Sequence, residues 1–306
     1  MTGSPAESLA SLPALPRAEI LRGLTEAEAA ELEYDWRFWA RPDQLEPPGA
    51  WSKWFIKTGR GWGKTRTAAE WVRAHVADTA RFNLVGRTAG AVRDVMVEGV
   101  SGILAVFPPW QRPDYEPSKR RITFHTGAVA TLFASEEPDQ LRGPQCEKFW
   151  AEELATWKYP RETWDNLMMG WRLGDDPRGV ITSTPRPVAL VRELMKDPTC
   201  RVTQGSSYAN RGNLSTAYYR EVIAPYEGTR LGRQEIHGEV LEDTPGALWT
   251  RKLIEKARVD AAPAGLVRVA VAIDPSVTNT EGSHECGVVT GGLDAAGPAY
   301  LFDDLS

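Results

Sequence analysis

A glycine-rich run near residue 60 carries the residue types best suited to binding a phosphate group. It reads FIKTGRGWGKTRTAAEWV over residues 55–72, with an arginine and a tryptophan between its glycines and a Lys-Thr pair after them. The residues before the run have the apolar character of a buried strand, and those after it have helical spacing. Successive backbone N–H groups in such a turn, together with the N-terminus of the helix, cradle phosphate oxygens. The run therefore predicts a phosphate-binding loop.

The residues of this run have distinct expected roles. Lys64 would reach the β- and γ-phosphates of a nucleotide, and the Thr65 hydroxyl would ligate magnesium. The residues expected to bind ATP are Gly59, Arg60, Gly61, Trp62, Gly63, Lys64 and Thr65. The usual P-loop pattern has glycine where this chain has Thr58, and Gly59 comes one residue later. The alternative is a glycine turn with an exposed lysine.

Two adjacent carboxylates end a later apolar segment, KFWAEE. Glu152 and Glu153 would stand at the end of a strand, one holding hydrated magnesium and the other orienting and deprotonating the attacking water. The separation from Lys64 leaves room for an inserted strand, helix and hairpin, which suits a motor-type ATPase better than a kinase for a small metabolite. The alternative is an ordinary acidic strand end.

Hydroxyl groups and an arginine lie on either side of this acidic pair in the sequence. The segment VITSTPRP ends a strand in Thr182, Ser183 and Thr184, which would sense the γ-phosphate and pass its loss to neighbouring structure. Arg142 lies on the polar loop SEEPDQLRGPQ, and its guanidinium would stabilise the transition state if placed on the γ-phosphate of a neighbouring subunit. The alternatives are a Ser/Thr-rich turn and a solvated loop arginine.

A last candidate carboxylate lies near the C-terminus. The segment VRVAVAIDPS puts Asp274 at the end of an apolar strand. Two-metal nucleases need such a rigid anchor for their first carboxylate. An Asp at a strand end is otherwise a cap or a turn residue, and both interpretations stay open.

Alternating strand and helix patterns must position these side chains. Strands are expected at residues 51–58, 81–87, 147–153 and 179–185, helices at 64–78, 89–107 and 161–173, and a β-hairpin at 120–134. Such alternation predicts a parallel sheet that is covered by helices. The expected fold class is therefore α/β.

Composition and periodicity divide the chain into four segments. Residues 1–40 are expected to form a mobile start followed by a short amphipathic helix, and residues 41–240 the main α/β domain. Residues 241–265 have the composition of a linker with one short helix. Residues 266–306 predict three consecutive strands, which is a meander and not a strand–helix alternation.

Charge and composition limit the classes of function. The 306 residues carry a formal net charge of −5, so contact with nucleic acid must use local basic patches. Cys146, Cys200 and Cys286 are far apart and the four histidines are scattered, which argues against a zinc site and fits a reducing cytosol. No apolar run approaches the roughly 20 residues of a membrane span. The N-terminus lacks a signal pattern, so we expect neither a membrane anchor nor secretion.

Taken together, these motifs resemble the large terminase subunit of tailed bacteriophages. The resemblance covers the chain from residue 40 or so to the end, and includes GRGWGKT, the Arg-Gly loop before the acidic pair, TSTPRP, the stretch 206–249 and AIDPSVTNTEGSHECGVV. It implies an ASCE-type P-loop NTPase with a mainly parallel sheet, followed by the truncated start of an RNase H-like nuclease domain. The activity of that family is ATP-driven threading of double-stranded viral DNA through a portal into a procapsid, with cleavage of the DNA by the same chain.

The resemblance also implies roles for single residues. Arg60 corresponds to the P-loop arginine, a second cation near the phosphates, and Gln44 to a residue that contacts adenine. Glu152 stands where relatives carry the metal-organising carboxylate, and Glu153 where they carry the catalytic glutamate. Most relatives have Asp at the first of these positions, so the division of labour between the two carboxylates stays open. The coupling motif of the family falls on residues 182–184.

Two further positions match motif residues of the family. Arg142 matches an arginine proposed to act on the ATP of the neighbouring subunit, and Asp274 matches the first nuclease carboxylate, which binds Mg²⁺ or Mn²⁺. Glu285, Asp303 and Asp304 are the only other local acidic candidates for that metal site. We therefore expect DNA cleavage from a complete nuclease domain and none from residues 1–306 alone.

The resemblance names cofactors and partners as well. It implies ATP with Mg²⁺, double-stranded DNA, the portal protein, the small terminase subunit, and a ring of copies of the chain on the portal. The implied location is the cytoplasm of a bacterial host, with transient docking on the procapsid portal. Two rival interpretations remain, a helicase-like DNA translocase without a viral role and a non-catalytic assembly protein. The TSTPRP motif before an RNase H-like strand argues against the first, and intact Lys64, Thr65 and Glu153 argue against the second.

Overall fold

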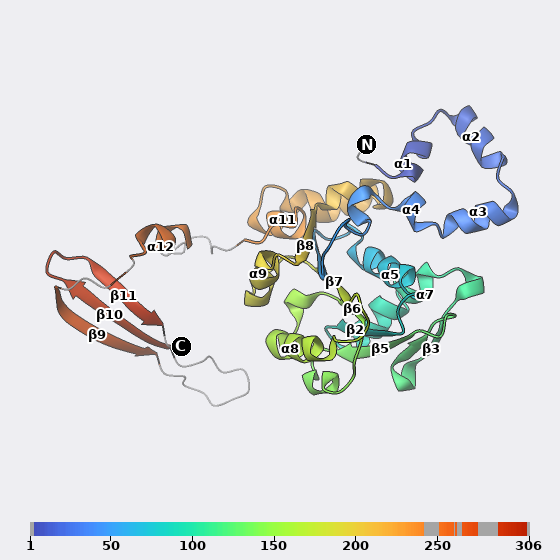
Figure 1. The fold of residues 1–306 in the computed structure, drawn as a ribbon. Helices are drawn as coiled ribbons and strands as arrows, with labels where there is room; N and C mark the ends of the chain where they lie inside the picture. Colours follow the sequence, from blue (N-terminus) through green and yellow to red (C-terminus); the bar gives the residue numbers. More distant parts are fainter. Residues whose placement is uncertain (1–2, 242–250, 260, 262–264, 275–286, 305–306) are drawn as a thin grey trace. The chain divides into compact units, whose positions relative to one another are not determined.

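The computed structural model describes residues 3–241, 251–259, 261, 265–274 and 287–304 of the chain. The chain forms two compact units, Met1–Glu242 and Asp243–Ser306 (Figure 1). The first unit contains a large α/β sheet structure together with the N-terminal helices, and the second contains a small antiparallel sheet.

The first unit is organised around an eight-stranded sheet with the strand order β3-β4-β5-β2-β6-β7-β1-β8. All neighbouring strands from β5 to β8 in this order are parallel, and β4 and β3 continue the sheet in antiparallel fashion beyond β5. The strands are β1 Lys53–Thr58, β2 Arg81–Gly86, β3 Asp114–Glu116, β4 Arg121–Thr123, β5 Val129–Ala134, β6 Lys148–Ala151, β7 Arg178–Ser183 and β8 Cys200–Gly205. The expected α/β fold with a mainly parallel sheet is confirmed.

Both faces of this sheet are buried under helices. Neighbouring residues of a strand point to opposite faces, and Phe55 and Ile56 of β1 accordingly join two different hydrophobic clusters. The cluster around Ile56 contains side chains of α5 (Lys64–Ala74). The cluster around Phe55 contains side chains of α8 (Pro160–Gly170) and α9 (Ala189–Lys196). Burial on both faces explains why these strands are continuously apolar in sequence.

The prediction of a continuous helix at residues 89–107 is wrong. The chain instead forms α6 (Ala89–Ala91), a π-helical turn at Val92–Val97 and α7 (Ile103–Val106). Two glycines allow the break, because a Cβ atom at Gly99 would lie 2.6 Å from the carbonyl oxygen of residue 95 and one at Gly102 would lie 2.8 Å from that of residue 96. The apolar spacing is helical on average, but the backbone folds back on itself at these glycines.

The N-terminal segment contains more helix than expected. In place of one short helix the structure has α1 (Pro5–Ala10), α2 (Ala14–Arg22) and α3 (Glu26–Glu33), followed by α4 (Trp36–Trp39). Prolines at positions 13 and 16 suggest a break, but they fall at the cap and in the first turn of α2, where a missing N–H group costs no hydrogen bond. No helix in the described part of the chain has the length and apolar character needed to cross a bilayer.

The segment after β7 contains elements that the sequence patterns did not indicate. Strand β8 lies at the edge of the sheet and contains only one buried residue, so it lacks the apolar signature of a strand. Short helical turns follow it, including α10 (Thr216–Tyr218) and α11 (Arg230–Glu235). They return the chain to the end of β1, where the buried Lys57 Nζ donates to the carbonyl oxygen of Gly238 at 3.0 Å.

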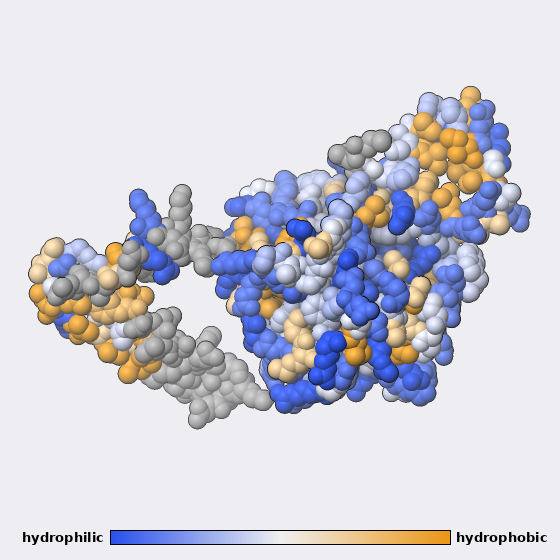
Figure 2. All heavy atoms as spheres, viewed as in Figure 1, coloured by the Kyte–Doolittle hydropathy of each residue, from blue (hydrophilic) through white to orange (hydrophobic). Residues whose placement is uncertain are grey.

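The second unit is an antiparallel meander with one short helix. Helix α12 (Arg251–Ala257) precedes β9 (Leu266–Asp274), β10 (Gly287–Asp294) and β11 (Ala299–Asp304), which pair in the order β11-β10-β9. These strands lie where the sequence indicates them. On β9, Val269 and Ile273 are 62% and 63% exposed, and apolar side chains gather on this sheet in Figure 2.

Candidate nucleotide-binding site

The glycine-rich run joins β1 directly to α5, as the sequence predicts. Lys64 is the first residue of α5, and Gly63 before it has φ +103°. Gly61 has φ +72°, so both glycines adopt left-handed backbone that a side chain would strain. Trp62 is fully buried and packs against Gly205 of β8, where an added Cβ atom would lie 2.1 Å from the indole nitrogen. The tryptophan therefore anchors the loop and does not face a ligand.

Side chains from outside the run hold its carbonyl groups. Three carbonyl oxygens accept side-chain hydrogen bonds: that of Arg60 from Ser207 Oγ at 2.6 Å, that of Gly61 from Asn210 Nδ2 at 2.6 Å, and that of Trp62 from Arg41 Nη2 at 2.9 Å. The backbone N–H groups of Gly59 and Arg60 also donate to protein carbonyls, at 2.9 and 2.7 Å. The anion-binding N–H groups are therefore those nearer the start of α5, at the N-terminus of the helix. The donor residues come from segments far away in the sequence, and no motif indicated them.

Lys64 and Glu153 meet directly in the structure. The Lys64 Nζ atom lies 3.0 Å from Glu153 Oε1 and 3.3 Å from the Thr184 hydroxyl. The Thr184 backbone N–H donates to the second carboxylate oxygen of Glu153 at 3.1 Å. Burial alone would raise the pKa of Glu153, but Lys64 and the Thr184 hydrogen bonds outweigh it and lower the pKa overall. Glu153 is therefore ionised at neutral pH, as a general base must be.

The backbone of Glu153 is itself unusual. Its φ of +50° and ψ of 44° are left-handed, which is uncommon for a residue with a side chain. Such conformations cost about 1–3 kcal/mol and concentrate at functional sites. Here the conformation turns the chain sharply after β6, so that adjacent side chains of residues 152 and 153 reach different partners.

Glu152 has a more secluded setting. Its Oε1 atom accepts from the Thr65 hydroxyl at 2.7 Å, and its Oε2 atom accepts from Trp150 Nε1 at 2.9 Å and from the Thr182 hydroxyl. Burial raises the pKa of Glu152, and the neighbouring charge of Glu153 adds to this. The two adjacent carboxylates thus have pKa values that move in opposite directions, a pattern that separates acid and base roles in active sites.

The oxygen donors of Thr65 and Glu152 suit a magnesium ion. A hydroxyl and a carboxylate are the hard ligands that Mg²⁺ prefers. Within the described ranges no three His, Cys, Asp or Glu residues cluster closely enough to hold a metal by themselves. The remaining ligands would therefore be phosphate oxygens and water, as is usual for Mg²⁺ at nucleotide sites.

The hydroxyl residues at the end of β7 connect these groups. Thr182, Ser183 and Thr184 are all buried, at 0%, 0% and 6% exposure. Thr182 contacts Glu152 and Thr184 contacts Glu153, while the Ser183 hydroxyl accepts from the backbone N–H of residue 155 at 3.1 Å. This strand end thus touches both carboxylates and the segment that follows them.

A cavity of about 620 Å³ lies over these groups. Its lining includes Lys64, Glu152, Glu153 and Thr184, together with Arg87 and Arg186. No role was expected for either arginine, although Arg186 lies within the TSTPRP motif. Their position relative to the predicted strands could have indicated them. Arg87 directly follows β2 and Arg186 lies three residues after the end of β7, and ligands bind at the carboxyl ends of parallel strands.

Two expected ligand contacts are occupied by protein partners. The Arg60 guanidinium pairs with Glu235 at 2.5 Å, and this hydrogen bond is the main reason that the pKa of Arg60 is raised. The Gln44 side chain accepts from the backbone N–H of Arg41 at 3.2 Å and donates to the Thr67 hydroxyl at 3.1 Å. Arg60 still lines the cavity, whereas Gln44 links the segment before β1 to α5.

The remaining expected site residues lie elsewhere. Arg142 is 65% exposed, pairs with Asp139 at 3.1 Å and lies outside the lining of the nucleotide cavity. Asp274 is the last residue of β9. Asp303 and Asp304 end β11, but the side chains of these two residues and of Asp274 lie outside the described part of the structure, as does the whole of Glu285.

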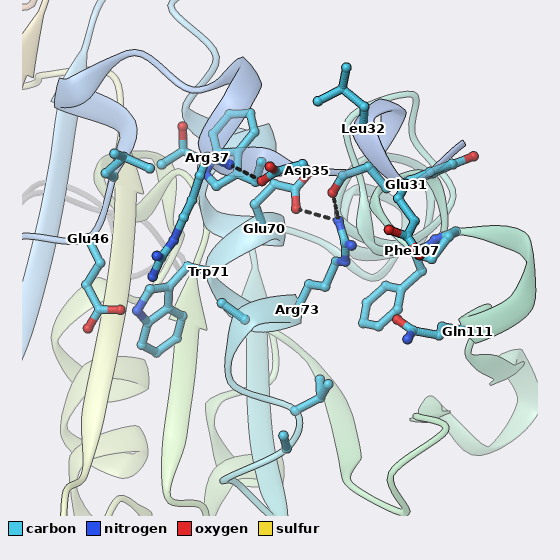
Figure 3. Close-up of a pocket in the computed structure, with 18 of the residues that line it drawn as sticks. Glu31, Leu32, Asp35, Arg37, Glu46, Glu70, Trp71, Arg73, Phe107 and Gln111 are labelled. Carbon is cyan, nitrogen blue, oxygen red and sulfur yellow. Dashed lines mark hydrogen bonds and ion pairs between the residues drawn. The ribbon is translucent and has the colours of Figure 1, made fainter. Parts of the chain in front are cut away.

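A second hollow, of about 1170 Å³, lies between the N-terminal helices and α5 (Figure 3). Arg73 pairs with Glu70 of the same helix at 3.2 Å and donates to the backbone oxygen of Tyr34 in the N-terminal segment at 2.7 Å. Burial raises the pKa of Glu70 although Arg66 and Arg73 oppose this. The hollow shares no lining residue with the nucleotide cavity, and no sequence motif indicated it.

A phosphate-binding loop joins β1 to α5, and an acidic pair ends β6. In the sheet, β7 lies between β1 and β6. This arrangement defines a P-loop NTPase of the ASCE type. The family model described as terminase large subunit, T4likevirus-type, N-terminal matches residues 55–256. The chain belongs to this family, and its resemblance to the large terminase subunit is confirmed.

Solved structures share the fold. The large terminase from a thermophilic bacteriophage, solved in complex with ADP, has a TM-score of 0.53 at 16% identity, over 90% of this chain and 68% of that one. The large terminase ATPase domain of Thermus phage P74-26 has a TM-score of 0.50 at 14% identity, over 69% of this chain and 97% of that one. The HK97 bacteriophage large terminase has a TM-score of 0.50 at 15% identity, over 91% of this chain and 67% of that one. A comparison with curated proteins gave no match.

Proposed function

We propose that this chain is an ATP-hydrolysing motor that moves double-stranded viral DNA into a procapsid. The observation that carries the proposal is the contact of Lys64 with Glu153 and Thr184 beside the contact of Thr65 with Glu152. These are the groups that a P-loop ATPase needs, and they meet in a chain of the terminase large subunit family. One of the similar solved structures is a large terminase in complex with ADP, which supports the same function.

The chain's own residues divide the work of hydrolysis. Lys64 and the N–H groups of the loop bind the phosphates, and Thr65 with Glu152 would hold magnesium. Bound magnesium supplies positive charge that offsets charge developing on the phosphates. When the phosphates take over Lys64, the ionised Glu153 loses its cation partner and can accept a proton from water.

Thr184 couples this chemistry to the fold. It contacts both Lys64 and Glu153, so its environment changes when the terminal phosphate is bound or lost. Thr182 and Ser183 end β7, which lies between β6 and β1 in the sheet, and Thr184 follows directly, so a change there would reach the neighbouring strands. We assign coupling of hydrolysis to movement to these residues.

The other parts of the proposal concern partners and domains. Arg142 would act on the ATP of a neighbouring copy in a ring on the portal protein, with the small terminase subunit as a further partner. The exposed position of Arg142 supports a role between subunits. Residues 1–40, 41–240, 241–265 and 266–306 would be the N-terminal segment, motor, linker and partial nuclease. Asp274 would be a metal ligand for Mg²⁺ or Mn²⁺ there, and the work would occur in the host cytoplasm.

The test is ATP hydrolysis with and without double-stranded DNA, for the wild-type chain and Lys64→Ala. We expect hydrolysis that DNA stimulates and that Lys64→Ala abolishes. Hydrolysis that is unchanged in Lys64→Ala would refute the assigned site. Hydrolysis that depends on Lys64 but never responds to DNA would leave an ATPase and refute the motor.

A further inference from the structure

We propose that Arg87 and Arg186 form a phosphate-binding pair, on either side of the acidic strand β6, that holds the terminal phosphate of the bound nucleotide. The inference rests on the proposed ATPase function and assigns roles to two residues for which the sequence motifs gave none. Both arginines line the cavity above Lys64, Glu152 and Glu153.

The sheet order brings the two arginines to the reacting end of the site. Arg87 directly follows β2 and Arg186 lies shortly after β7, and these are the two neighbours of β6. The backbone at Arg87 is held in place, because the buried Ser135 hydroxyl donates to its carbonyl oxygen at 2.9 Å. Arg186 stands between two prolines, which restrict the backbone on both sides. The backbone that carries each of the two arginine side chains is therefore fixed in place.

Charge pairing leaves these two cations for a ligand. Lys64 pairs with Glu153 at 3.0 Å and Arg60 pairs with Glu235 at 2.5 Å, so those cavity charges offset each other. Arg87 and Arg186 are exposed, and within the part of the chain that the structure describes their side chains have no ion pair or hydrogen bond. Among the described residues that line the cavity, Arg87 and Arg186 are thus the cations without an ion-pair partner, and Glu152 is the remaining carboxylate.

A terminal phosphate matches this pair in charge and in shape. A phosphate monoester carries about two negative charges at neutral pH. The planar guanidinium binds phosphate oxygens through parallel N–H groups, and such charge-assisted hydrogen bonds are roughly twice as strong as neutral ones. Since the loop N–H groups hold the inner phosphates and Lys64 reaches the β- and γ-phosphates, an arginine pair beside the acidic strand adds contacts that only a triphosphate makes.

The experiment compares the affinities of the magnesium complexes of AMP-PNP and ADP by titration calorimetry. The proteins are the wild-type full chain, Arg87→Ala, Arg186→Ala and, as control, Arg112→Ala, which removes an exposed arginine outside the cavity. We expect each cavity variant to bind AMP-PNP about tenfold more weakly or worse, the loss of one charged hydrogen bond. ADP affinity stays near the wild-type value, Arg87→Lys is intermediate, and Arg112→Ala is unchanged.

Two outcomes separate the inference from the function on which it rests. A wild-type chain that binds neither nucleotide overturns the proposed ATPase function and the inference with it. A wild-type chain that prefers AMP-PNP, with the same preference in both cavity variants, overturns the inference alone. Equal weakening of both nucleotides also refutes it, because it indicates a general effect on the site and not contact with the terminal phosphate.

Discussion

At the scale of single residues, two adjacent glutamates acquire different chemistry from their partners. Glu153 faces the cation Lys64, while Glu152 is surrounded by neutral donors and is buried. The opposite shifts of their pKa values follow from this difference. The structure therefore favours Glu153 as the base and Glu152 as the metal-holding residue, and this assignment leads to two predictions.

Glu153→Gln should lower ATP turnover by about a hundredfold to ten-thousandfold, the usual loss when a positioned base is removed. The amide keeps the shape of the side chain, so nucleotide binding should persist. Phosphate release and nucleotide titration measure the two properties separately. Wild-type turnover in this variant would show that another group activates water.

Glu152→Gln should be more stable than the wild type at neutral pH in the absence of nucleotide and metal. Because the folded-state pKa of Glu152 lies above 4.5, the native state retains a proton that the unfolded chain releases. Its stabilising effect is present below pH 4.5 and is lost as the pH rises through the raised folded-state pKa. Glutamine does not titrate and therefore has no such loss. A difference of about 1 kcal/mol in the free energy of unfolding between the two proteins corresponds to about 2–4 °C in Tm.

Thermal unfolding from pH 4.5 to neutral pH, followed by circular dichroism, compares the two proteins. The difference in Tm should grow in favour of Glu152→Gln as the pH rises. A difference that is constant across this range would mean that Glu152 does not titrate abnormally. The same variant should weaken the effect of magnesium on nucleotide affinity.

At the scale of elements, the phosphate-binding loop depends on strand β8 and on the turns that follow it. Trp62 of the loop fills the space above Gly205, and Ser207 and Asn210 hold two of its carbonyl groups. An edge strand with little apolar character is thus required for the shape of a site on the neighbouring strand.

Gly205→Ala should destabilise the first unit and weaken nucleotide binding. Its Cβ atom would lie 2.1 Å from the indole nitrogen of Trp62, and overpacking of this kind costs about 1–3 kcal/mol. Gly212→Ala is the matched control, because its Cβ atom would meet nothing within 4 Å. Denaturant unfolding and nucleotide titration measure both effects. If the two variants have the same stability and the same nucleotide affinity, the phosphate-binding loop does not depend on its packing against β8.

At the scale of the whole molecule, the nucleotide site of one chain lacks the arginine that the family resemblance assigns to it. Arg142 lies outside the cavity lining and is held by Asp139. If Arg142 serves a neighbouring copy, Arg142→Ala and Lys64→Ala should each be inactive alone. A mixture should recover part of the ATPase activity, because the second variant can lend its arginine to the intact loop of the first.

The mixing experiment is read under conditions in which rings assemble on the portal protein, with light scattering to verify assembly. Recovery that rises with the fraction of mixed neighbours supports the role between subunits. An assembled mixture with no recovery contradicts that role. ATP hydrolysis by the free chain at the same rate as by the ring would also contradict a role of Arg142 between subunits.

The amino-acid sequence alone determined the mainly parallel α/β fold, the loop between β1 and α5, and the carboxylates at the end of β6. Each of these depends on local spacing, and the carboxyl ends of parallel strands necessarily meet at one edge of the sheet. It did not determine the broken helix after β2, because average apolar spacing does not reveal where glycines let the backbone fold back.

Only the tertiary structure decided which partners the site residues meet. Arg60 pairs with Glu235 and Trp62 packs on Gly205, although more than a hundred residues separate each pair in the sequence. The cations Arg87 and Arg186 likewise became visible only once the other charges of the cavity had been paired. Ion pairs and close packing depend on distances between side chains, and folding alone brings residues from distant parts of the chain to those distances.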